Sequence, residues 1–269
     1  MTPDPFAAFK QQSRVGWAKY APLAVFTKRP AAHVVRVAGV RAGQEVLDVG
    51  CGTGSVALTA RRLGARATGL DLTPELLAVA KEDASLAGLD DVTWKEGDAE
   101  NLPFRDGAFD VVLSQFGHMF APRAAVATKE MLRVLKPGGT LAFSTWDPAG
   151  ATGANFALIG KYLPPPPAGM DFPLAWGEPA VVRERLGKAV KDVHFERGQL
   201  EYQTINTRHM AEDLAQSLGP VLGIRQMLAG EPAKWAQFMR ELADAHEPYF
   251  DGHDNVVRLD YIIARATKA

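Results

Sequence analysis

The 269-residue chain has only one cysteine, Cys51. An intrachain disulfide is therefore excluded, and so is a metal site made only of cysteines. Long apolar runs are also missing, since no stretch approaches the ~18 apolar residues of a membrane helix. Residues 1–10 include an aspartate and two prolines and lack a cationic segment followed by an apolar run, so they do not resemble a secretory signal. We expect a soluble, cytoplasmic protein with no membrane span.

An excess of charge of one sign is absent as well. The chain has 30 Lys and Arg residues against 31 Asp and Glu residues, for a formal net charge of -1. Such a balance offers no basic surface for nonspecific binding of nucleic acid, so we expect a small-molecule partner and no nucleic acid. Hydrophobic residues make up 47% of the chain, which is typical of a folded globular protein. The length alone is compatible with one domain or two.

Short apolar runs alternate with helical stretches between residues 45 and 146. Strands are predicted at 45–50, 66–71, 92–96, 109–114 and 140–146. Helices are predicted at 55–63, 73–88 and 122–135, and Thr73-Pro74-Glu75 has the residue types that begin a helix. This alternation predicts a parallel sheet with helices on both faces.

The alternation is lost after Trp146. Residues 147–177 are rich in Gly, Pro and Ala and include Pro164 to Pro167, which indicates a stiff, extended surface segment. Further along, strands are predicted at 193–202 and 256–266, and helices at 209–249 with breaks at Gly219-Pro220 and Glu231-Pro232. The first 40 residues or so indicate short amphipathic helices.

The strongest local motif is the glycine-rich segment from Asp48 to Gly54, Asp-Val-Gly-Cys-Gly-Thr-Gly, between the first strand and the first helix. Glycines there allow a tight turn and the close approach of a ligand. The segment departs from the dinucleotide fingerprint, which wants glycine or alanine where this chain has Ser55.

Two acidic residues follow the next two strands. Asp71 ends the second strand, where a carboxylate can accept hydrogen bonds from ribose hydroxyls. Asp98, in Gly97-Asp98-Ala99 after the third strand, could accept from an exocyclic amine such as that of adenine. Since the carboxyl ends of parallel strands meet at one sheet edge, the three acidic positions together predict a nucleotide-containing cofactor.

These motifs occur in a fixed order with Phe109-Asp-Val-Val112 and Leu135-Lys-Pro-Gly-Gly139. Together they resemble a class I S-adenosylmethionine (SAM)-dependent methyltransferase. Within that class the chain is similar to the bacterial small-molecule branch that includes ubiquinone and menaquinone biosynthesis C-methyltransferases. The resemblance is tight over residues 40–146 and looser as far as the final strand. It implies a Rossmann-like, seven-stranded, mostly parallel α/β sheet with an antiparallel last strand and helical lid insertions.

The resemblance also implies roles for matching residues. The loop residues Gly50, Cys51, Gly52, Thr53 and Gly54 would line the methionine and ribose part of SAM, and Asp48 would support the loop and the amino group. Asp71 would hold the ribose diol, Leu72 would pack on adenine, Asp98 would bind the adenine amine near Ala99, and Ser114 would lie by the methionyl group. S-adenosylhomocysteine would be the product, and no metal is expected.

The residues after the fourth strand are the candidates for chemistry. His118 is the candidate catalytic base because histidine titrates near neutral pH, although an orienting or packing role is the alternative. Candidates for an apolar acceptor pocket, each with core packing as the alternative, are Trp17, Tyr20, Phe116, Met119, Phe120 and Trp176. His246-Glu247 and Asp251 to Asp254 lack metal-ligand spacing, so a surface turn before the last strand is favoured there.

The sequence thus predicts one methyltransferase domain over residues 1–269. It would comprise a helical cover at 1–39, a SAM-binding core at 40–146, lid insertions at 147–192 and 204–255, and final strands at 193–203 and 256–266. We expect methyl transfer to carbon or oxygen of a small, partly apolar, aromatic or quinone-like acceptor, by a monomer or homodimer. The alternatives are a noncatalytic SAM-binding regulatory protein and an NAD-dependent oxidoreductase, which would share Asp71 and make no use of Asp98.

Overall fold

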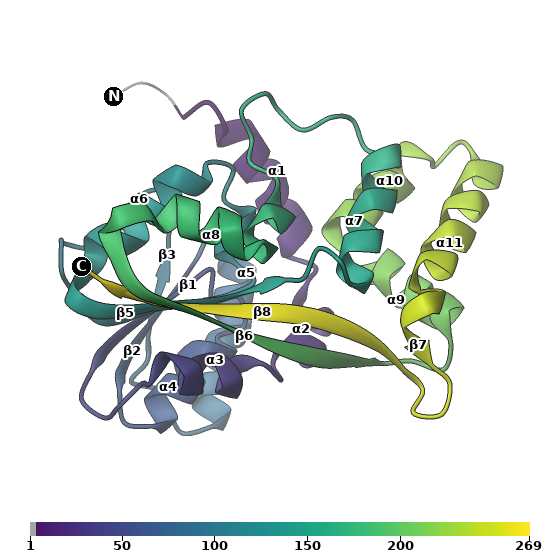
Figure 1. Ribbon diagram of the computed structural model, residues 1–269. Coiled ribbons are helices and arrows are strands. Elements are labelled where there is room, and N and C mark those ends of the chain that lie inside the picture. The colour runs from purple at the N-terminus through teal and green to yellow at the C-terminus, as the bar shows by residue number, and fades with distance from the viewer. Residues whose placement is uncertain (1–3) are drawn as a thin grey trace.

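A twisted β-sheet runs through the centre of the protein, whose computed structural model describes residues 4–269 (Figure 1). Seven strands follow the order β3-β2-β1-β4-β5-β8-β6, and the short strand β7 pairs with β8 beside this path. The strands are β1 (Glu45–Val49), β2 (Arg66–Asp71), β3 (Thr93–Glu96), β4 (Phe109–Gln115), β5 (Leu135–Trp146), β6 (Val190–Gln203), β7 (Phe250–Asp251) and β8 (Val256–Lys268).

Strands β1 to β5 are mutually parallel, whereas β8 is antiparallel to β5 and β6 is antiparallel to β8. The predicted mostly parallel, Rossmann-like sheet is therefore confirmed. The count is eight because the two-residue strand β7 adds one to the expected seven.

Helices cover both faces of this sheet. Three helices precede the first strand: α1 (Ala7–Trp17), α2 (Ala21–Thr27) and α3 (Ala31–Ala38). Four more connect strands of the sheet: α4 (Ser55–Arg62), α5 (Pro74–Leu86), α6 (Ala124–Val134) and α8 (Pro179–Leu186). In Figure 1, α3 and α4 lie on one face of the sheet, and α6 and α8 lie on the other. Burial on both faces explains why the central strands are continuous apolar runs.

A second group of helices lies at one end of the long strands β6 and β8 (Figure 1). It consists of α7 (Ala151–Tyr162), α9 (Thr207–Ser217), α10 (Gly219–Met227) and α11 (Pro232–His246). The rings of Tyr162 on α7 and Phe238 on α11 pack edge to face with centroids 4.9 Å apart, and the Tyr162 hydroxyl donates to Glu241 at 3.0 Å. Single-turn helices are η1 (His118–Phe120), η2 (Pro173–Gly177), η3 (Gly187–Ala189) and η4 (Glu247–Tyr249).

Helix α7 lies in the region expected to form a lid insertion, where sequence composition indicated no particular helix. Gly153 and Gly160 disfavour a helix there. However, α7 buries Ala151, Leu158 and Ile159 on one side, and this packing outweighs the weak propensity. The proline run at 164–167 has no helix or strand and is exposed, as expected.

No helix within residues 4–269 combines the length and the apolar character needed to cross a membrane.

Burial in β5 generates a first prediction. Leu141 is fully buried where β5 joins β4 on one side and β8 on the other. Leu141→Ala should lower the free energy of unfolding by about 2–5 kcal/mol, because the lost methylene groups leave a cavity. Leu86→Ala is the control, since Leu86 is 82% exposed and should cost less than about 0.5 kcal/mol. Urea denaturation of both variants measures the difference, and equal losses would contradict this packing.

Candidate functional site

The loop between β1 and α4 turns through three glycines with positive φ, at 65° for Gly50, 54° for Gly52 and 82° for Gly54. A Cβ on Gly50 would lie 2.8 Å from Gly117 Cα, and one on Gly54 would lie 2.4 Å from the Trp94 ring. A Cβ on Gly52 would meet no atom within 4 Å. Because Gly52 lines a large cavity at this sheet edge, the open space beside it is available to a ligand.

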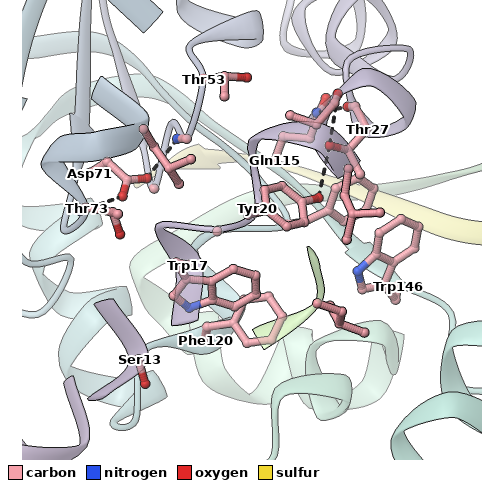
Figure 2. Close-up of a pocket in the computed structure, with 18 of the residues that line it drawn as sticks. Ser13, Trp17, Tyr20, Thr27, Thr53, Asp71, Thr73, Gln115, Phe120 and Trp146 are labelled. Atoms are coloured by element: carbon pink, nitrogen blue, oxygen red, sulfur yellow. Dashed lines mark hydrogen bonds between the residues drawn. The ribbon is translucent and has the colours of Figure 1, made fainter. Parts of the chain in front are cut away.

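Asp71, at the end of β2, holds this loop in place. Its Oδ2 accepts a hydrogen bond from the Gly52 backbone N–H at 2.7 Å, and its Oδ1 accepts from Thr73 N–H at 2.9 Å (Figure 2). Burial raises the pKa of the Asp71 carboxyl, and these backbone hydrogen bonds oppose the shift. Each oxygen keeps a further lone pair for a ligand that enters the cavity.

Asp48, at the end of β1, is 1% exposed and also lines the cavity. Its Oδ2 accepts from the Ala57 N–H at 3.1 Å, whereas its Oδ1 is buried with no partner among the described residues. Burial raises the pKa of this carboxyl to about 7, and the charge of Asp71 contributes to the rise. A buried oxygen without a partner is unfavourable, so the position suits a cationic hydrogen-bond donor.

Lys10 on helix α1 forms ion pairs beside the part of the cavity that Asp98 lines. The Lys10 ammonium lies 2.6 Å from Asp98, 2.7 Å from Asp4 and 2.5 Å from Glu100, whose side chain is 1% exposed. Arg123 pairs with the same carboxylate oxygen of Glu100 at 2.6 Å. Lys10 and Asp98 both line the cavity, so this ion cluster joins α1 to the segment that follows β3.

Aromatic side chains form the next part of the cavity wall. The rings of Trp17 and Phe120 pack with centroids 4.7 Å apart (Figure 2). Phe116 stacks on Trp146 at 3.9 Å with an interplanar angle of 2°. Phe116 has a φ of 58°, a conformation unfavourable for a residue with a side chain, so the neighbouring structure must hold it. Beyond these rings the wall continues onto α7, α9, α10 and α11.

Comparison with known proteins assigns the family. Residues 47–143 match a family model described as a methyltransferase domain. An uncharacterised protein of Mycobacterium tuberculosis is 35% identical over 236 residues, which cover 87% of this chain and 85% of the relative. A Staphylococcus aureus protein named demethylmenaquinone methyltransferase is 44% identical over 111 residues, covering 40% of this chain and 45% of its own.

The chain belongs to the class I SAM-dependent methyltransferases. The solved structure of the Bacillus subtilis YcgJ protein shares the fold, with a TM-score of 0.60 at 21% identity over 89% of this chain and 98% of that one. Neither the regulatory nor the nicotinamide alternative finds support in these comparisons.

Most residues that sequence analysis selected for this methyltransferase lie on the wall of one cavity. They are Trp17, Tyr20, Asp48, Gly50, Cys51, Gly52, Thr53, Asp71, Leu72, Asp98, Ala99, Phe116 and Phe120. Burial and the nearby carboxylates of Asp71 and Asp48 raise the pKa of the Cys51 thiol well above its usual value, which fits a packing role.

Five selected residues lie elsewhere. Position 54 must be glycine because the Trp94 ring leaves no room for a Cβ there. The Ser114 hydroxyl donates to the Val49 carbonyl at 2.6 Å, which ties β4 to β1 behind the cavity. Met119 and Trp176 are each 1% exposed and belong to the hydrophobic core.

His118 is the fifth, and its position corrects the prediction of a catalytic base. It is fully buried against Phe143 and Trp176, and it does not line the cavity. Both ring nitrogens lack a hydrogen-bond partner among the described residues. Burial, with the charge of Arg185, lowers the pKa of His118 to about 3, so the ring is a packed, neutral group.

Other polar residues on the cavity wall were not expected from the sequence, notably Lys10, Asn155 and His246. His246, assigned to a surface turn, is the last residue of α11 and is 1% exposed. A signal was present, because Phe238, Leu242 and His246 follow at intervals of four residues and share one helix face. Lys10 and Asn155 carry no comparable signal.

The ion cluster generates a second prediction. Lys10→Met should lower the free energy of unfolding by about 3–5 kcal/mol, because it leaves the buried Glu100 carboxylate with Arg123 alone. Arg14→Met on the same helix removes an exposed pair with Glu96 and should cost about 0–1 kcal/mol. Denaturation by guanidinium chloride compares the two, and a Lys10 variant as stable as the Arg14 variant would show that the cluster does not fasten α1.

Proposed function

We propose that this protein transfers the methyl group of SAM to carbon or oxygen of a small, partly apolar acceptor that is aromatic or quinone-like. The observation that carries the proposal is the continuity of one cavity. It joins the glycine loop and the carboxylates of Asp48, Asp71 and Asp98 to a region walled by aromatic rings. A cofactor and an apolar acceptor could therefore meet inside one cavity, and their binding would displace water from it.

The residues at the sheet edge fit the polar groups of SAM. The unpartnered Oδ1 of Asp48 suits the α-ammonium of the methionine part, and Gly52 leaves room for the cofactor. Asp71 has lone pairs left for the ribose hydroxyls, and Leu72 and Ala99 offer apolar surface near Asp98 for adenine. SAM supplies an electrophilic methyl group on a sulfonium. The protein would therefore bind SAM and the acceptor, align the acceptor with the methyl group and shield both from water.

The aromatic walls support the acceptor class. Trp17, Phe116, Phe120 and Trp146 present flat apolar surfaces to the cavity, and planar rings pack favourably on such surfaces. The partial relative named demethylmenaquinone methyltransferase supports a quinone-like acceptor for this chain too. We further propose that residues 1–39, 147–192 and 204–255 are covers of one catalytic domain rather than a second domain.

A glycine pair tests the cofactor site. Gly52→Ala places a methyl group in the open space beside the loop, so it should weaken SAM binding about tenfold or more, equivalent to ~1.4 kcal/mol. Gly43→Ala is the matched control: Gly43 also has positive φ and open space for a Cβ, but it lies outside the cavity. Each should lose a similar ~1–2 kcal/mol of stability from the backbone conformation. Calorimetry with SAM decides, and equal affinities in both variants would refute the site.

Asp48 predicts a pH dependence of cofactor affinity. With its pKa raised to about 7, Asp48 is increasingly protonated and neutral as the pH falls through 7, so it loses its attraction for an ammonium group. The α-amino group of SAM, with a pKa of about 8, stays cationic over this range. The dissociation constant for SAM should rise by up to about tenfold per pH unit below 7.

Titration calorimetry at pH values from about 5.5 to 7.5 measures this dependence. Asp48→Asn is neutral at every pH, so its SAM affinity should be weak and nearly constant over the range. A wild-type profile parallel to that of the variant would exclude Asp48 as the partner of the ammonium.

A further inference from the structure

We propose that His246 is the catalytic base of this site and that the acceptor carries a phenol-like hydroxyl group, which is methylated on oxygen. The inference rests on the proposed methyl transfer and narrows its acceptor class. It assigns to the carboxyl end of α11 the role that His118 cannot perform from within the core.

The first observation is the position of His246. Among residues 4–269, it is the one histidine on the cavity wall. The same wall also includes Met210, Leu214 and Leu259, which are apolar and buried. His246 is 1% exposed, so it lies away from bulk water on the wall of the cavity in which an apolar acceptor would lie.

The second observation is the tautomer that the helix imposes. The Nδ1 atom of His246 lies 2.7 Å from the Leu242 carbonyl oxygen, one turn earlier in α11. A carbonyl only accepts, so Nδ1 must carry the proton and donate it. Nε2 then holds a lone pair, and no hydrogen bond from residues 4–269 reaches it. Burial lowers the pKa of His246, which keeps the ring neutral and able to accept a proton at neutral pH.

The third observation is a second polar group on the same wall. Asn155, on α7, is 8% exposed, and its Oδ1 is buried with no partner in the described part of the chain. The Tyr162–Glu241 hydrogen bond joins α7 to α11, so both polar groups are presented by packed helices. An amide with unused bonding capacity in an apolar enclosure suits a polar group of a ligand, and we assign Asn155 as a positioning residue for the acceptor.

Tyr202, another polar ring on this wall, already uses its hydroxyl in a hydrogen bond. The Tyr202 hydroxyl donates to Asp213 at 3.2 Å, and burial together with that carboxylate raises the pKa of Tyr202. Of these two rings, His246 is the one with a free basic atom.

Methyl transfer to the acceptor oxygen balances with His246 as the base. The acceptor hydroxyl gives its proton to Nε2 of His246 as its oxygen forms a bond to the methyl carbon. The sulfur–methyl bond of the donor breaks, and its electron pair stays on sulfur, which converts the sulfonium into a neutral thioether. The imidazolium returns its proton to water once product leaves.

Nitrogen NMR of the protein labelled at histidine tests the tautomer without any substrate. At pH 7 the His246 ring should be neutral, with Nδ1 protonated and Nε2 bare. Adding 1-naphthol to the complex with S-adenosylhomocysteine should shift the Nε2 resonance. A charged ring, the opposite tautomer or no shift with 1-naphthol would each overturn the proposal.

Methyl transfer from labelled SAM tests the role itself, with 1-naphthol and 1-naphthylamine as acceptors of matched size. His246→Asn keeps an N–H that can donate to Leu242 but has no basic nitrogen, so kcat with 1-naphthol should fall about 10²-fold or more. The melting temperature and the SAM affinity should stay near those of the wild type. His253→Asn, at an exposed turn, is the control and should retain full activity.

The outcomes distinguish a failure of the proposed methyl transfer from a failure of the role of His246. A wild-type protein that does not bind SAM would refute the proposed function and the base with it. If the His246→Asn variant binds SAM and methylates 1-naphthol as well as the wild type does, only the role of His246 is refuted. Methylation of 1-naphthylamine but not of 1-naphthol would refute the hydroxyl acceptor.

Discussion

The site depends on the contact between Gly50 and Gly117, where the loops after β1 and β4 meet backbone to backbone. A Cβ on Gly117 would lie 2.4 Å from the Gly50 carbonyl oxygen, so neither position can carry a side chain without moving the loops. The Ser114 hydroxyl reinforces the junction, since it donates to Val49 and accepts from His118 N–H at 3.0 Å. The loops are thereby held in the shape that leaves Gly52 and Phe116 on the cavity wall.

Much of the sheet could be predicted from sequence because the central strands carry short apolar segments, such as Val46-Leu47 in β1 and Val111 to Leu113 in β4. The carboxyl ends of parallel strands lie at one edge, which is why Asp48, Asp71 and Asp98 reach one cavity although they are far apart in the chain. Local chemistry was sufficient here, because each acid lies at the carboxyl end of its own strand or within two residues of it, and the strand alone places it.

Tertiary packing decided what the sequence could not show. Helix α7 forms despite its glycines because it packs on α11, and no local pattern reveals that partner. The places of His118 and His246 were missed for the same reason: the first follows β4 but lies in the core, and the second ends a distant helix and lies on the cavity wall. Lys10 lies 88 residues from Asp98 in sequence, so their ion pair exists only in the folded chain.

The central claim is that one enclosure holds SAM at the glycine loop and the acceptor among the aromatic rings. A crystal structure with S-adenosylhomocysteine tests it most directly. We expect the amino group near Asp48, the ribose hydroxyls on Asp71, and the thioether sulfur turned toward the region walled by Phe120 and Trp146. A ligand bound outside this cavity, or with its sulfur turned away from those rings, would contradict it.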